Sequence, residues 1–149
     1  MSPVQLSLKG RALRLLSGRE HSRTELERKL ARFAEEPGTL TRLLDELQAQ
    51  GFISEQRVIE SVLHRRAAKL GAARVKQELQ GKGLDPQAVA QAMTQLKLSE
   101  HERALAVWQK KFGSTPATPT EAARQIRFLA ARGFGAEAIR RIVKGPASA

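Results

Sequence analysis

The sequence predicts an all-α fold of three tandem three-helix, helix-turn-helix-like repeats in an elongated arrangement. Apolar residues recur at helical spacing along the chain, and no convincing alternating strand pattern appears. A helical phrase also returns at an offset of 50 residues. A fixed repeat of this length is typical of copied units that stack into an array. Such arrays expose long surfaces, so we expect function to lie along the outside and not in one catalytic cleft.

The repeat sets the expected boundaries, because it aligns the second and third units. We therefore place helical repeats at residues 1–53, 54–98 and 99–149. Each unit is small and is expected to need its neighbours for stability. The matched pairs are Arg74 and Arg124, Leu79 and Leu129, Lys82 and Arg132, Gly83 and Gly133, Leu84 and Phe134, and Val89 and Ile139.

The first unit contains three amphipathic stretches. Ser22 stands three residues before Glu25, which is the spacing of a capping box at a helix start. Glu25 also precedes Lys29 by four residues, which favours an ion pair along the helix. The expected helices cover residues 8–16, 26–33 and 40–47, with Pro37 and Gly38 in the turn before the last one.

The second unit begins at Ser54. Its first helix is expected to run through Arg65, Arg66 and Lys69 and to end at Gly71. A second helix around 75–79 should stop at the glycines that follow, and its Arg74 and Glu78 have the spacing of an ion pair. The third helix, 85–96, has an N-cap aspartate at Asp85 and a first-turn proline at Pro86.

The third unit opens with a second candidate capping box, from Ser99 to Glu102. Trp108 lies on the apolar stripe of the helix that follows, so we expect it in the core. After a loop at 114–117, Thr118 is the expected cap of a helix whose apolar residues include Ile126. Gly133 should break that helix, residues 138–143 should form the last one, and the tail from Gly145 is expected to fray.

Charge is the strongest compositional signal. The chain has 26 Lys and Arg, 15 Asp and Glu, and a net charge of +11. The excess grows along the chain, with nine basic and seven acidic residues in 1–53, eight and four in 54–98, and nine and four in 99–149. Such a balance favours a polyanionic or acidic partner. The expected electropositive surface consists of Arg65, Arg66, Lys69, Arg74, Lys76, Lys82, Lys110, Lys111, Arg124, Arg127, Arg132, Arg140 and Arg141. Some of these are expected to be structural.

Catalytic chemistry is not indicated. The absence of cysteine excludes disulfides and thiolate metal sites, and His21, His64 and His101 are dispersed. No phosphate-binding G-x-x-x-x-G-K-[ST] stretch or nucleophile elbow occurs. His21 beside the cap Ser22 is interpreted as structural. We therefore expect no enzyme activity, no cofactor and no metal. No apolar run approaches the ~18 residues that span a bilayer, so a cytoplasmic protein is expected.

Two DNA-binding interpretations remain open. A Gly-containing turn between the last two helices of a unit resembles a helix-turn-helix, although the helix at 85–96 carries no Lys or Arg to read bases. A general DNA-binding helical protein would explain the charge equally well. An inert helical scaffold would need no anionic partner at all.

Residues in all three units follow one family's pattern, namely Glu20, His21, Ser22, Glu25, Leu26, Lys29, Leu30, Leu47, Gly51, Phe52, Ile53, Glu55, Arg57, Gly71, Arg74, Val75, Glu78, Leu79, Lys82, Gly83, Phe128, Leu129, Arg132, Gly133, Phe134 and Ile139. With these residues the chain resembles the RecX regulatory proteins. The resemblance covers nearly the whole chain, in the family's order. It implies a non-enzymatic modulator that binds the RecA recombinase and its nucleoprotein filament and lowers ATP hydrolysis and strand exchange. We expect a monomer.

The chain departs from that family's pattern at four positions. Ser54 and Glu55 stand where relatives often have two aspartates, and Val58 stands where an aromatic residue is common. Leu70 likewise precedes Gly71 where an aromatic residue often does. These changes preserve packing, so they concern the partner contact more than the fold.

Overall fold

The computed structural model describes residues 5–145 and is all-α over that range, which confirms the predicted fold class. The expected fraying of the tail concerns residues 146–149, which lie outside the described part. The helices are α1 (Leu8–Gly18), α2 (Arg23–Leu30), the short 3-10 helix η1 (Ala31–Phe33), α3 (Thr39–Ala49), α4 (Glu55–Arg66), α5 (Ala72–Gly81), α6 (Pro86–Leu98), α7 (Glu100–Lys111), α8 (Pro119–Ala131) and α9 (Ala136–Val143).

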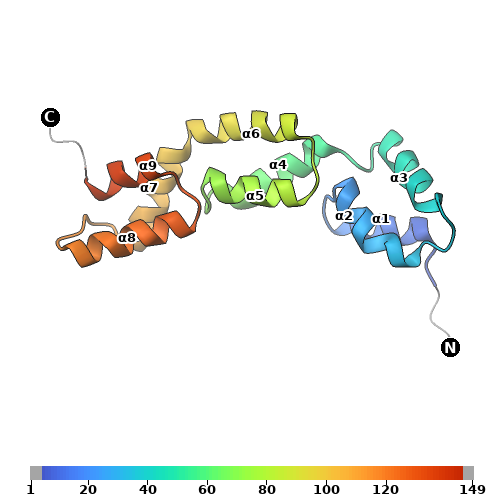
Figure 1. Ribbon diagram of the computed structural model, residues 1–149, viewed down its shortest axis with the longest axis horizontal. Coiled ribbons are helices and arrows are strands. Elements are labelled where there is room, and N and C mark those ends of the chain that lie inside the picture. The colour runs from blue at the N-terminus through green and yellow to red at the C-terminus, as the bar shows by residue number, and fades with distance from the viewer. Residues whose placement is uncertain (1–4, 146–149) are drawn as a thin grey trace.

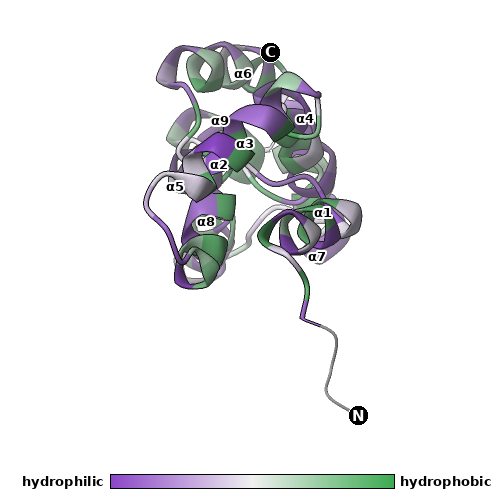
Figure 2. Ribbon diagram, turned by 90° about the vertical axis from the view of Figure 1, so that its right-hand side faces the viewer, coloured by the Kyte–Doolittle hydropathy of each residue, from purple (hydrophilic) through white to green (hydrophobic). Residues whose placement is uncertain are grey.

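The helices form a row of three groups, with the two ends of the chain at opposite ends of the row (Figure 1). Helices α1 to α3 lie at one end, α4 to α6 in the middle, and α7 to α9 at the other end. Viewed along the row, the ribbons alternate between hydrophilic and hydrophobic residues, as amphipathic helices do (Figure 2). The molecule is therefore elongated, and most residues lie close to a surface.

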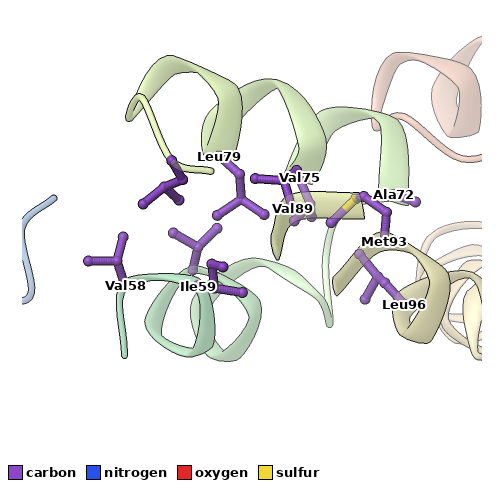
Figure 3. Packing of buried hydrophobic residues seen from close by; sticks show 10 residues of the cluster. Val58, Ile59, Ala72, Val75, Leu79, Val89, Met93 and Leu96 are labelled. Atoms are coloured by element: carbon purple, nitrogen blue, oxygen red, sulfur yellow. The ribbon is translucent and has the colours of Figure 1, made fainter. Parts of the chain in front are cut away.

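Each group of helices encloses its own hydrophobic cluster. In the middle cluster, side chains from α4, α5 and α6 point toward one another (Figure 3). Leu79 and Val75 are fully buried there. In the C-terminal cluster the indole of Trp108 is buried, as predicted, and its Nε1–H donates to Gln125 Oε1 at 2.8 Å. Gln125 is thus buried on α8 together with Leu129, whereas the apolar side chain of Ile126 is 43% exposed.

The helix termini follow most of the sequence signals. Ser22 and Glu25 form the predicted capping box of α2. The side chain of Asp85 caps α6, with Pro86 in its first turn, and Thr118 caps α8. The capping box expected from Ser99 to Glu102 is wrong. Ser99 ends α6 as well as preceding α7, and its hydroxyl donates back to the Leu96 carbonyl.

Helix α4 is shorter than predicted. It ends at Arg66, so Lys69 lies in the turn before Gly71 and not on the helix. The carbonyls of Ala67 and Leu70 in this turn accept hydrogen bonds from Arg103 Nη1 at 2.8 and 2.7 Å. An arginine from α7 therefore satisfies carbonyls at the end of α4 that have no partner within the helix.

Two ion pairs expected within helices are replaced by pairs between elements. Glu25 pairs with Arg19 and Lys82, whereas Lys29 Nζ lies 3.0 Å from His21 Nε2. The two predictions assumed that oppositely charged residues four positions apart on a helix form an ion pair with each other. Isolated pairs of that kind are worth only ~0.2–0.5 kcal/mol, so contacts from other elements decide the partners. In the same way, Glu78 pairs with Arg66 and not with Arg74.

Adjacent groups meet through a repeated joint. At the first joint, the carbonyl of Lys82, just after α5, accepts a hydrogen bond from Ser22 Oγ at the start of α2, at 2.7 Å. At the second joint, the carbonyl of Arg132, just after α8, accepts one from the Gly71 amide at the start of α5, at 2.8 Å. In both cases the turn that ends the second helix of one group docks on the start of the second helix of the preceding group.

The two glycines of these turns are required by the joints. Gly83 and Gly133 have φ angles of +67° and +87°, in the left-handed region. A Cβ atom on Gly83 would lie 2.2 Å from the hydroxyl of Thr24, and one on Gly133 would lie 2.6 Å from the backbone nitrogen of Arg74. Any side chain at either position would push the neighbouring groups apart.

Glu100 and Arg103 of α7 also bind the middle group. Glu100 Oε1 accepts a hydrogen bond from the Ala72 amide at 2.8 Å and so caps α5, whose N-cap Gly71 has no side chain to do so. Arg103 bonds the Leu96 carbonyl at 3.0 Å and the Ser99 hydroxyl in addition to the two carbonyls after α4. Burial lowers the pKa of Arg103 below its ordinary value, and the opposite effect of the nearby Glu100 carboxylate is smaller.

Candidate partner-binding surface

The thirteen predicted basic residues are spread over the middle and C-terminal groups, and most are exposed. They do not form one continuous patch. Arg65 and Arg66 end α4, and Lys69 follows in the turn. The others are Arg74 and Lys76 on α5, Lys82 after it, Lys110 and Lys111 at the end of α7, Arg124 and Arg127 on α8, Arg132 after it, and Arg140 and Arg141 on α9.

Besides Lys111, which lies over the Phe128 ring at the longer distance of 5.6 Å, four of the thirteen have polar or aromatic partners within the fold. Lys82 pairs with Glu25 across the first joint, with their side chains only 12% and 11% exposed. Arg74 Nη1 donates to the Ala131 carbonyl across the second joint at 2.6 Å. Arg66 pairs with Glu78, and the Arg132 guanidinium lies over the ring of Phe128. Partner binding by these four residues stays a prediction, and each of them also has a structural contact within the fold.

Lys69, Lys110, Lys111 and Arg132 gather around one groove, although they come from three segments of the chain. The groove has a volume of about 550 Å³. Its floor is apolar and comprises Ala68, Ala106, Val107 and Phe128. We call this the basic-rimmed groove. Of the described residues that line it, none is acidic.

The aromatic ring at this groove is held by its neighbours. Phe128 packs edge-on against Phe112, with ring centroids 5.3 Å apart and planes at 84°. The Arg132 guanidinium lies 4.3 Å from the Phe128 centroid, and Lys111 Nζ lies 5.6 Å from it. Cations at these distances are attracted by the ring quadrupole. The rim charges thus lie directly beside the apolar floor.

The remaining basic residues lie elsewhere. Arg140 and Arg141 border a second hollow, of about 530 Å³, beside Trp108 and Lys144. Lys76 borders a third hollow, together with Lys97. Arg65, Arg124 and Arg127 are exposed and line none of these three hollows.

Sequence reasoning missed Lys97 and Lys144 and the apolar side of the surface. Val107, Lys110 and Lys111 have the i, i+3, i+4 spacing of one helix face, so the sequence did contain a signal for the groove along α7. The lining residues that come from outside α7 show no such spacing in the sequence. Lys69 and Phe128 reach the groove only because the second joint brings the middle and C-terminal groups together.

The buried histidine near the first joint has a structural environment. His21 Nδ1 lies 3.0 Å from the Arg19 carbonyl, so it donates there, and Nε2 then accepts from Lys29 Nζ. Burial lowers the pKa of His21, which favours the neutral ring. For Glu25, burial raises the pKa, but hydrogen bonds from Arg19, the Ser22 amide and Lys82 together bring it down to about 2. This cluster holds helix starts in place.

Neither a metal site nor a membrane span is present in residues 5–145. No three His, Asp or Glu side chains of that range are grouped so that they could hold a metal ion. Within the same range, every helix is too short or too polar to cross a bilayer.

Fold and surface together define a class of protein: an all-α array of three-helix units with basic side chains along two of its three groups. The family model for the RecX third three-helix domain matches residues 99–143, and the model for the RecX second three-helix domain matches residues 54–93. The chain belongs to the RecX family of regulatory proteins.

Relatives across nearly the whole chain carry the same family name. The regulatory protein RecX of Leptothrix cholodnii is 50% identical over 140 residues, covering 94% of this chain and 89% of the relative. That of Ralstonia nicotianae is 49% identical over 140 residues, covering 94% and 88%.

A solved structure shares the fold. The crystal structure of RecX from Lactobacillus salivarius superposes with a TM-score of 0.73 at 18% identity, covering 92% of each chain. At that identity the likeness concerns the fold alone.

Proposed function

We propose that the protein is a non-enzymatic regulator that binds RecA and the RecA–DNA filament and inhibits recombination and ATP hydrolysis. The observation that carries the proposal is the row of three helical groups with exposed basic side chains along the middle and C-terminal groups. The relatives named regulatory proteins support it. The proposal places the protein in the cytoplasm, where such a partner meets DNA, and has it act as a monomer.

The shape suits a filament as partner. Helices of 8 to 13 residues are arranged in sequence, so the contacts on successive groups are spaced along one direction. A filament presents copies of one surface in a line. Once one group of helices binds, the next contact is intramolecular, and several weak contacts combine through effective concentration.

A general DNA-binding protein that competes for DNA is the second candidate. The exposed Arg124, Arg127, Arg140 and Arg141 favour it, because phosphate contacts need only accessible cations. This mode of action predicts a steep dependence of inhibition on salt. Direct RecA binding should instead persist without DNA and depend on apolar contacts as well.

A paired titration separates the two. The protein is titrated into RecA that is hydrolysing ATP on single-stranded DNA, and in parallel into the same DNA without RecA, in the same salt. Inhibition at concentrations too low to occupy the DNA supports action on the filament. Inhibition that follows DNA occupancy supports the competitor, and no inhibition refutes both.

A charge-reversal variant tests the surface. Arg65→Glu with Lys69→Glu changes two exposed residues of the middle group and leaves the Arg66–Glu78 pair intact. The matched control is Arg14→Glu with Arg42→Glu, which makes the same charge change on exposed residues of the N-terminal group. We expect the first variant alone to weaken inhibition. Equal effects of both would mean that only net charge matters.

A further inference from the structure

We propose that the basic-rimmed groove is a docking site for an acidic peptide segment that carries an apolar side chain. The proposal deepens the function proposed above by giving the chemistry of one protein contact, and its biological meaning rests on that function. The groove itself can be tested without RecA.

The rim defines the charge of the occupant. Lys69, Lys110 and Lys111 are exposed, and Arg132 is half-buried beside them. Four cations around one groove with no acidic residue among the described lining residues repel one another. An occupant with several carboxylates would offset that repulsion and supply complementary charge along the rim.

The guanidinium of Arg132 also suits a carboxylate, through the nitrogens that face outward and not through its buried Nε. The Nε of Arg132 is buried and has no hydrogen-bond partner among the described residues. The other nitrogens of a guanidinium form a planar fork that matches a carboxylate, so an acidic side chain on the exposed side of Arg132 would be recognised with defined geometry.

The floor defines the rest of the occupant. Ala68 and Ala106 are exposed, and Val107 and Phe128 are half-buried, so apolar surface faces solvent between the cations. A volume of about 550 Å³ accommodates an aromatic or branched side chain with the backbone on either side of it. Apolar contact in the centre with charges around it is the usual anatomy of a protein–protein contact.

Nucleic acid fits this groove less well than a peptide. Phosphates would use the cations but not the apolar floor. Base stacking needs a free aromatic face. The Phe128 ring already contacts Arg132 and Lys111 and forms an edge-to-face pair with Phe112. The same cations over an apolar floor therefore favour carboxylates attached to an apolar anchor.

The test uses the full chain and a short fluorescein-labelled peptide of glutamate and aspartate around one leucine–phenylalanine pair. Fluorescence anisotropy measures its binding. We expect binding that weakens sharply when the apolar pair is replaced by glycine and serine, and also when the acids are replaced by glutamine. An affinity that depends only on peptide charge would overturn the proposal.

Two variants locate the site. Lys110→Gln with Lys111→Gln should weaken peptide binding about fivefold or more, whereas Arg124→Gln with Arg127→Gln removes the same charge outside the groove and should have a smaller effect. Ala106→Gln places a longer polar side chain over the floor without changing charge, at an exposed helical position that tolerates it. It should weaken binding by at least as much. No effect of Ala106→Gln on binding would refute the groove.

Binding of a labelled oligothymidylate tests the alternative that the groove is a site for nucleic acid. If its binding falls with Lys110→Gln, Lys111→Gln and Ala106→Gln while peptide binding does not, the groove is a nucleic-acid site and the proposal fails. RecA inhibition is measured separately on the same variants. Peptide binding without inhibition would contradict the proposed function but not the groove, and inhibition without peptide binding would contradict the groove alone.

Discussion

The hydroxyl of Ser22 donates a hydrogen bond of 2.7 Å to the carbonyl of Lys82, 60 residues further along the chain. The same oxygen accepts the amide of Glu25 at 3.1 Å and so caps α2. One small side chain therefore starts a helix and joins two groups of helices. Glu25 repeats this double use, because its carboxylate completes the capping box and pairs with Lys82 Nζ.

Ser22→Ala should destabilise the protein more than an ordinary cap mutation. It removes the cap, worth ~1 kcal/mol, and leaves the part-buried Lys82 carbonyl without its donor, which costs a further ~1 kcal/mol. Ser54 is the matched control, since its side chain caps α4 by accepting the Arg57 amide at an exposed site. Urea denaturation of both variants measures the difference. Equal shifts of the two denaturation midpoints would show that the hydrogen bond between Ser22 and Lys82 adds nothing to stability.

Gly133→Ala should separate the middle and C-terminal groups. The added Cβ would lie 2.6 Å from the Arg74 nitrogen, at a φ of +87°. Gly113 has a similar φ of +76°, but its Cβ would meet nothing closer than the Gln109 carbonyl at 3.4 Å. Gly113→Ala should therefore cost only the ~1–2 kcal/mol of the left-handed conformation. A lower melting temperature for Gly133→Ala than for Gly113→Ala is expected, and the reverse order would contradict the joint.

Acid should weaken the first joint. The pKa of Glu25 is about 2 when folded, below its ordinary value of 4.5. A depressed pKa means that its contribution to stability is complete above pH 4.5 and is lost as the pH falls toward 2. Glu25→Gln should lower stability at neutral pH and reduce the further loss within that window. Glu46→Gln, which breaks an exposed pair with Lys9, is the control and should lower stability at neutral pH by less.

Arg103→Lys should loosen the contact between α7 and the middle group, although it keeps the charge. Arg103 bonds the carbonyls of Ala67, Leu70 and Leu96 and the hydroxyl of Ser99. An ammonium cannot reproduce this planar set of donors, so a loss of about 2 kcal/mol is expected. Faster hydrogen exchange at Leu70 and the residues around it would confirm the effect. Arg124→Lys, at an exposed site on α8, should leave exchange unchanged.

Local signals were enough to predict the fold class and most helix termini. Ser22 with Glu25, Asp85 with Pro86 and Thr118 with Pro119 act within one turn of chain, where propensity and capping decide the outcome. Ser99 failed for a local reason too, because only one residue separates α6 from α7 and its hydroxyl bonds the helix that it ends.

Contacts between helices could not be predicted from the sequence. The partners of Glu25, Glu78 and Arg103 come from other elements, and no spacing rule within a helix indicates them. The same holds for the basic-rimmed groove, since Lys69 and Phe128 are 59 positions apart. Charge composition predicted that cations would be exposed, but only the packing decides which of them share a hollow.

The joint has two halves, and the outer groups carry one half each. The first group offers the Ser22 start of α2, but its own second helix runs into η1 instead of a basic residue and glycine. The third group offers the turn at Arg132, which already docks on the start of α5, and the start of its own α8 is capped by Thr118. Because the first group lacks the glycine turn, it has no counterpart of the Lys82 or Arg132 contact to place on the α8 start of a second molecule, so this contact does not repeat from one molecule to the next.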